Sequence, residues 1–152
     1  MTRDELIESA QALKQPERSV SDEYERKKYI LVSRVIENLQ QRKDINRLVG
    51  EGNVPMMEDN IHNMARFMGS IFIQYDAAVF VETILWVFRT YRSHGFQLAF
   101  WSAHLNIWIG TIHSELSKNA NLELYPFYDW IQIHIPQFTT LTDSAVSEVK
   151  DS

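Results

Sequence analysis

The amino-acid sequence predicts an all-α fold, a single-domain helical bundle of about five to seven helices. Apolar residues recur at steps of three and four along most of the chain, which is typical of helices that turn one face to a core. No alternation of apolar and polar residues lasts longer than a few positions, so no strand is predicted. A chain of 152 residues, 45% of them hydrophobic, can bury such a core without disulfides, and this one contains no cysteine.

Two helix starts are visible near the N-terminus. Thr2 and Glu5 have the spacing of a capping box, which predicts a short helix that ends before Gln15-Pro16. Ser21, followed by two acidic residues, predicts the start of a second helix that runs to about Arg42. Apolar residues follow one side of this second helix and charged residues the other, so we expect it to lie on the surface of the core.

The middle of the chain predicts a short helical turn, a loop and two longer helices. Residues 44–49 have the pattern of the turn, and the glycines in residues 50–53 mark the loop. A helix over residues 54–75 then places its apolar side chains at steps of three and four. Asp76 is the expected cap of the next helix, which Ser93-His94-Gly95 ends.

The last part of the chain predicts one long and one short helix. Residues 97–117 form the long one, and asparagines mark its end. We expect Pro126 to be the first residue of the final helix, because proline fits the first turn, and Pro136 to stop it after about His134. This divides the chain into three parts: an N-terminal helix and linker (1–20), the helical bundle domain (21–138) and a flexible C-terminal tail (139–152).

The charge pattern does not favour nucleic acid as a partner. Basic and acidic residues balance in residues 1–52, and the net charge of −5 comes from the rest of the chain. The one basic cluster, Arg26-Lys27-Lys28, is flanked by Glu23 and Glu25, whereas binding to phosphates needs a concentrated basic face.

We also expect neither a signal peptide nor a membrane span. Residues 1–13 contain three acidic side chains and no apolar segment of signal-peptide length. The longest nearly apolar stretch, Ala77 to Phe88, is interrupted by Glu82 and Thr83 and is shorter than the roughly 20 residues that a membrane helix needs. The cytoplasm is therefore the expected location.

Aromatic and histidine side chains suggest a candidate binding pocket. A pocket between helices could be bounded by His62, Trp86, Trp101, His104 and Trp108, with a tetrapyrrole as its most concrete guest and an imidazole as axial ligand. The alternative is that these side chains fill an ordinary core, in which His104 hydrogen-bonds to a neighbour. Both readings demand the same apolar stripes, and no cofactor is assigned.

A metal-dependent enzyme is a weaker alternative. Glu58, Asp59 and His62 are close enough on one helix for a carboxylate and an imidazole to approach one ion. A helical di-iron site would need two Glu-x-x-His motifs and two more glutamates, and only Asp59-Asn-Ile-His62 approximates one. The sequence also contains no nucleophile elbow, Walker loop or dinucleotide fingerprint, so we expect no enzymatic activity and assign no catalytic or metal-binding residue.

Several short segments between Met57 and Ile112 occur in a familiar order: Glu-Asp-Asn-Ile-His62, Phe67-Met68, Asp76-Ala-Ala-Val-Phe80, Ile84-Leu-Trp86 and Arg92-Ser-His-Gly95. This order resembles the helical region that precedes the cobalamin-binding domain in bacterial regulatory proteins. More loosely, it is similar to the globin-like sensory domains of stressosome proteins. The resemblance implies a bacterial sensory or interaction module that regulates a partner. The chain lacks the Asp-x-His-x-x-Gly motif that ligates cobalt in that family.

The function that we expect is therefore a non-enzymatic helical regulatory module that forms a homodimer or docks onto a partner protein. The amphipathic second helix and the strongly apolar stretch Phe96 to Ile109 are the expected contact surfaces. A small-ligand sensor, of the tetrapyrrole type, is the alternative function, followed by the metal-dependent enzyme.

Overall fold

The computed structural model describes residues 1–151, with side chains placed as far as Asp143, and it confirms the all-α fold. These residues form eight helices and no strand, one helix more than the largest number expected. The helices are α1 (Arg3–Ala10), α2 (Arg18–Gln40), α3 (Ile45–Val49), α4 (Val54–Ile73), α5 (Ala77–Ser93), α6 (Leu98–Glu115), α7 (Lys118–Ile133) and α8 (Ile135–Asp151).

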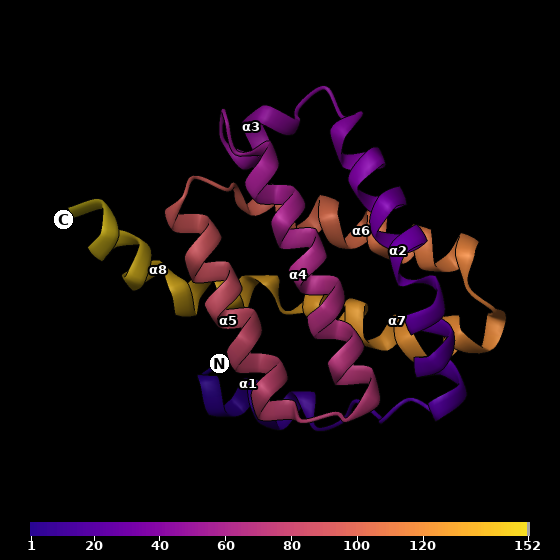
Figure 1. The fold of residues 1–152 in the computed structure, drawn as a ribbon. Coiled ribbons are helices and arrows are strands. Elements are labelled where there is room, and N and C mark those ends of the chain that lie inside the picture. The colour runs from indigo at the N-terminus through magenta and orange to yellow at the C-terminus, as the bar shows by residue number, and fades with distance from the viewer. Residues whose placement is uncertain (152) are drawn as a thin grey trace.

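The helices form two crossing groups around one core (Figure 1). α4 crosses in front of α6 and α7, and α5 crosses in front of α8. α6 and α7 run antiparallel to each other and are joined by a tight corner. α2 packs against both α4 and α6, and α8 packs mainly against α5. None of the helices in the described part of the chain combines the length and apolar composition that crossing a membrane requires.

Aromatic rings hold the two groups together. Phe127 of α7 meets Phe72 of α4 and Phe80 of α5 edge to face, with ring centroids 5.3 Å and 5.9 Å apart. Phe88 of α5 stacks on Trp101 of α6 at 4.4 Å. Edge-to-face and offset pairs contribute about 0.5–1.5 kcal/mol each beyond the burial of their surface. The aromatic-rich stripes seen in the sequence therefore meet in one core.

α2 and α4 pack closely where a glycine faces a tyrosine. A Cβ atom added to Gly69 would lie 3.3 Å from Cε1 of Tyr24 and would also overlap the carboxylate of Glu25. The Tyr24 hydroxyl donates to the backbone carbonyl of Ala65 at 2.7 Å. Burial raises the pKa of this hydroxyl well above its ordinary value, so it remains a donor. The contact fixes the first half of α2 against the second half of α4.

The predicted caps are confirmed at α1 and α5 and wrong at α2. Thr2 and Glu5 form the full capping box, and Asp76 accepts from the backbone N–H of Val79. α2 begins at Arg18, three residues before the expected start, and Ser21 lies inside its first turn. Its hydroxyl donates to the carbonyl of Arg18 at 3.0 Å, which is the alternative use of serine in a helix.

The N-terminal segment expected as a separate helix and linker packs on the same core as the rest. Leu6 and Ala10 of α1 are fully buried, and Arg3 pairs with Glu82 of α5. In the linker, the Gln15 amide donates to the carbonyl of Phe72 and accepts from the N–H of Tyr75, both at 2.6 Å. Residues 1–20 thus cover one end of α4 and α5.

α7 corrects the expectation that Pro126 opens the last helix. The helix begins eight residues earlier, at Lys118, because Ser117 accepts from the N–H of Ala120 and caps it. Pro126 lies inside this helix and is exposed. Its missing N–H leaves the carbonyl of Leu122 without the usual intrahelical donor, which a helix tolerates on a face open to water.

α8 occupies the residues expected to form a flexible tail from Thr139 onward. The helix continues to Asp151, and Phe138 and Thr142 are fully buried. Arg92 of α5 donates to the carbonyl of Thr139 and to the hydroxyl of Thr142, and it pairs with Asp143 at 2.8 Å. Thr139 and Thr142, which lie in the expected tail, therefore accept hydrogen bonds from the half-buried Arg92. Pro136 lies in the first turn of α8, where no N–H is needed.

Candidate functional site

The five residues proposed to bound one pocket lie in separate environments. His62 is exposed on α4, and the Trp86 side chain is 58% exposed on α5. Trp101, His104 and Trp108 of α6 are each at most 2% exposed and pack against neighbouring rings. The structure therefore does not gather the five side chains around one cavity. Binding of a tetrapyrrole stays a prediction with no preformed site among them.

The buried imidazole of His104 takes part in the core. The indole N–H of Trp108 donates to its Nε2 at 2.8 Å, and its ring stacks on Phe100 with centroids 5.2 Å apart. Because an indole nitrogen only donates, the proton of neutral His104 must be on Nδ1, which has no partner among the described side chains. Burial lowers its pKa to about 3, so the ring is neutral. Axial ligation through Nε2 would require breaking the bond from Trp108.

Glu58, Asp59 and His62, in the first turns of α4, do not form part of a metal-binding cluster among the described residues. Glu58 accepts a hydrogen bond from the side chain of Gln40 on α2, while Asp59 and His62 are exposed. Within the described residues, no three histidine, aspartate or glutamate side chains come together in a way that would hold a metal ion. Glu58 therefore ties α4 to α2.

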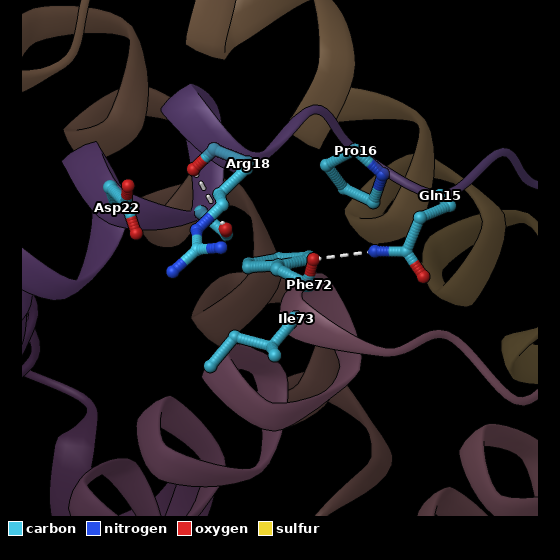
Figure 2. Close-up of a pocket in the computed structure, with 7 residues that line it drawn as sticks. Gln15, Pro16, Arg18, Asp22, Phe72 and Ile73 are labelled. Carbon is cyan, nitrogen blue, oxygen red and sulfur yellow. Dashed lines mark hydrogen bonds between the residues drawn. The ribbon is translucent and has the colours of Figure 1, made fainter.

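A hollow of about 520 Å³ opens between the start of α2 and the end of α4 (Figure 2). Arg18 and Asp22 flank it on the α2 side, and Phe72 and Ile73 on the α4 side. Gln15 reaches across it to the backbone of Phe72, as the dashed line in Figure 2 shows. The hollow thus lies where three segments of the chain meet.

Most polar groups of this hollow are already used by the fold. Both ends of the Gln15 amide bond to the backbone, and the Ser21 hydroxyl bonds to the carbonyl of Arg18. Only Arg18 and Asp22 keep charged groups open to solvent. A binding site normally has several polar groups that converge on a ligand, so we assign this hollow a structural role.

A second hollow lies on the surface between α6 and α7, and we call this surface the α6–α7 face. It is a groove of about 410 Å³ whose lining is mostly apolar. Leu122 and Tyr125 stand beside it with 67% and 47% of their surface exposed. Its residues are Ile109, Gly110, His113, Lys118, Asn121, Leu122 and Tyr125.

No contact within the described part of the chain requires a glycine at position 110 of the α6–α7 face. Gly110 lies in the second half of α6 and is exposed, and a Cβ added to it would meet nothing within 4 Å. Glycine inside a helix costs about 1 kcal/mol relative to alanine. Grooves flank it on both sides, the other being lined by Arg34, Ile107 and Ser114 among others. A glycine in this place lets another molecule approach the α6 backbone closely.

Two charges on α7 extend the α6–α7 face along the helix. Lys118 and Asp129 lie one turn beyond Leu122 and Tyr125 at either end. Among the described side chains, neither forms an ion pair, although Asp129 accepts a hydrogen bond from the Tyr125 hydroxyl at 3.2 Å. The face therefore carries an apolar centre between an exposed cation and a half-buried anion.

The surfaces expected from the sequence are different from this one. The aromatic side chains of the stretch Phe96 to Ile109 are buried, because α2 covers one side of α6 and α7 covers another. Its large apolar side chains at the surface are the exposed Leu98 and the half-buried Ile107 and Ile109. The α7 part of the face was missed because the helix was placed after Pro126. The signals were Ser117 in capping position and the spacing of Lys118, Leu122, Tyr125 and Asp129.

Comparison with protein families, with curated proteins and with solved structures found no match to this chain. The resemblance of residues 57–112 to the helical region beside cobalamin-binding domains, and the globin-like arrangement, therefore stay predictions.

Proposed function

We propose that this chain is a non-enzymatic helical module that regulates a partner through protein–protein contact, and that the α6–α7 face is its contact surface. The proposal assigns no catalytic role to any residue. It keeps the interaction role expected from the sequence and moves the surface from Phe96–Ile109 to the groove between α6 and α7.

The exposed apolar centre of the face carries this proposal. Leu122 is 67% exposed and Tyr125 47%, and both stand beside a groove with Ile109 and Gly110 in its wall. Contiguous apolar surface beside a groove marks interaction sites more often than scattered exposed residues do, and tyrosine is enriched among residues that dominate binding energy. An exposed helical glycine without an internal contact adds a second feature of the same surface.

Site-specific photo-crosslinking tests the proposal. A photoreactive phenylalanine analogue in place of Leu122, in the cells that make this protein, should give a discrete covalent adduct to a protein. Tyr29 of α2 is the control position, because its side chain is 81% exposed and lies on a different surface. We expect no matching adduct from position 29.

The result distinguishes contact through the face from unspecific proximity. An adduct of one defined mass from position 122 alone supports the proposed surface, whether the partner is another protein or a second copy. No protein adduct from position 122, or the same adducts from both positions, contradicts the proposal.

A further inference from the structure

We propose that the partner on the α6–α7 face is a second copy of this chain, paired through an antiparallel contact of the two α7 helices around a two-fold axis. This inference rests on the proposed function and commits it to one occupant. It comes from the order of four residues along α7.

The four residues form a seam on one side of the helix. Lys118, Leu122, Tyr125 and Asp129 follow one another at steps of four, three and four. These are the steps of the a and d positions in a coiled coil, which bring side chains to one line facing a second helix. Lys118, Leu122 and Tyr125 are exposed and Asp129 is half-buried. The seam is therefore open to a partner from Lys118 to Tyr125 and partly covered at Asp129.

The seam is complementary to itself when two copies run in opposite directions. The pairs Lys118–Asp129 and Leu122–Tyr125 share one midpoint, between Glu123 and Leu124. A two-fold axis at this midpoint places each lysine opposite the aspartate of the other copy and each leucine opposite the tyrosine. One register thus satisfies both the charges and the apolar centre.

Lys118 and Asp129 cannot pair with each other within one chain. Asp129 lies eleven positions after Lys118, which is roughly 16 Å along a helix and too far for an ion pair within one chain. The nearby carboxylates already have partners: Glu23 accepts from the N–H and the hydroxyl of Ser117 at 2.6 Å and 2.7 Å. Glu115 pairs with Arg34 at 3.6 Å, and Glu123 accepts from the backbone N–H of Glu17 at 2.7 Å. Lys118 and Asp129 are the charges left to define the register.

The groove beside the seam explains how the copies could pack closely. Side chains of one seam need holes in the other surface, and the groove of about 410 Å³ between α6 and α7 provides one. Gly110 in its wall carries no side chain that would fill it. An alanine there should favour the helix itself and weaken the contact between copies.

The size of the face sets the expected affinity. α7 has 16 residues, so the contact is roughly 24 Å long and about two helices wide. A contact of this length and width buries less surface than the roughly 800 Å² per partner of a standard interface. We therefore expect a weak dimer, with a dissociation constant of about 10–100 µM.

A charge-swap cycle tests the register. Lys118→Asp should place two anions opposite each other, and Asp129→Lys two cations, so each should raise the dissociation constant at least about fivefold. The double variant exchanges the charges and should return to within about twofold of the original chain. Sedimentation velocity at low salt, from about 5 to 500 µM protein, measures the constant, and circular dichroism checks that each variant is folded. Asp59→Lys, an exposed change of the same charge on α4, is the matched control and should have no effect.

Rescue by the double variant supports the inference. A chain that is monomeric over the whole range overturns it, and so does a double variant as weak as the single ones. A monomeric chain that still gives an adduct with a different protein from position 122 removes the second copy and leaves the proposed function intact. A monomeric chain without such an adduct removes both.

Discussion

The imidazole of His104 is a polar group that the fold keeps neutral. It accepts one hydrogen bond from Trp108 and stacks on Phe100, with its remaining N–H unpaired among the described side chains. A buried donor without a partner costs about 1–3 kcal/mol. Protonating the ring would add a buried charge, which is why burial holds its pKa near 3. The free energy of unfolding should therefore fall in weakly acidic solution because of this one residue.

We predict that His104→Leu makes the fold less sensitive to acid. In the unfolded chain the ring takes up a proton near pH 6.5, while in the fold it does so only near 3. Between these values the unfolded state binds more protons, so stability falls as the pH falls, by at most about 1.4 kcal/mol per pH unit.

Urea unfolding at about pH 7 and about pH 4.5 measures this loss. The original chain should lose about 2 kcal/mol more than His104→Leu between the two conditions. Comparing the change with pH, and not the absolute stability, removes the separate cost of leaving the Trp108 N–H without an acceptor. Equal losses in the two chains would show that His104 titrates normally in the fold.

α7 combines a well-made start with a weak middle. Ser117 caps it and is itself held by Glu23 of α2, so three helices meet at this corner. Burial raises the pKa of Glu23, but the two bonds from Ser117, with Arg26 and Lys27 nearby, together hold it below its ordinary value. Pro126 then interrupts the hydrogen bonds of the helix eight residues later. The helix forms despite the proline because its apolar face is buried on the core, which contributes most of the stability of a helix in a protein.

Pro126→Ala should raise the stability of the protein. The new N–H can donate to the carbonyl of Leu122, and the clash of the proline ring with that carbonyl disappears. We expect a gain of about 1–3 kcal/mol in the free energy of unfolding, measured by thermal or urea denaturation. Asn119→Ala, a substitution in the first turn of the same helix, should change stability by a few tenths of a kcal/mol. A lower melting temperature for Pro126→Ala than for the original chain would mean that the proline stabilises a bend the fold needs.

For the whole molecule, the helical class and most helices could be predicted from periodicity and caps alone. The caps at Thr2 and Asp76 and the glycine loop at 50–53 were predicted correctly because their signals lie within a few residues of each other. The expectations for Pro126 and for the tail after residue 138 were wrong because both segments depend on distant partners. These partners are the core under α7 and Arg92 of α5. Burial likewise depends on neighbouring helices. The sequence of α6 or α7 alone could therefore not show that Trp101 is buried and Leu122 is exposed.

Leu122 lies at the centre of the proposed contact between proteins, with a second copy as the proposed partner. Leu122→Asp should abolish that contact, because a charge would enter its apolar centre, and should leave the fold intact, because the side chain is 67% exposed. Tyr29→Asp, at the exposed position on α2, is the matched control.

Sedimentation equilibrium of these three chains, from about 1 to 500 µM, is the most direct measurement. We predict that the original chain and Tyr29→Asp dimerise with the same constant and that Leu122→Asp remains a monomer with an unchanged unfolding midpoint. Equal association of all three chains, or loss of the dimer in Tyr29→Asp alone, would contradict the assignment of the α6–α7 face.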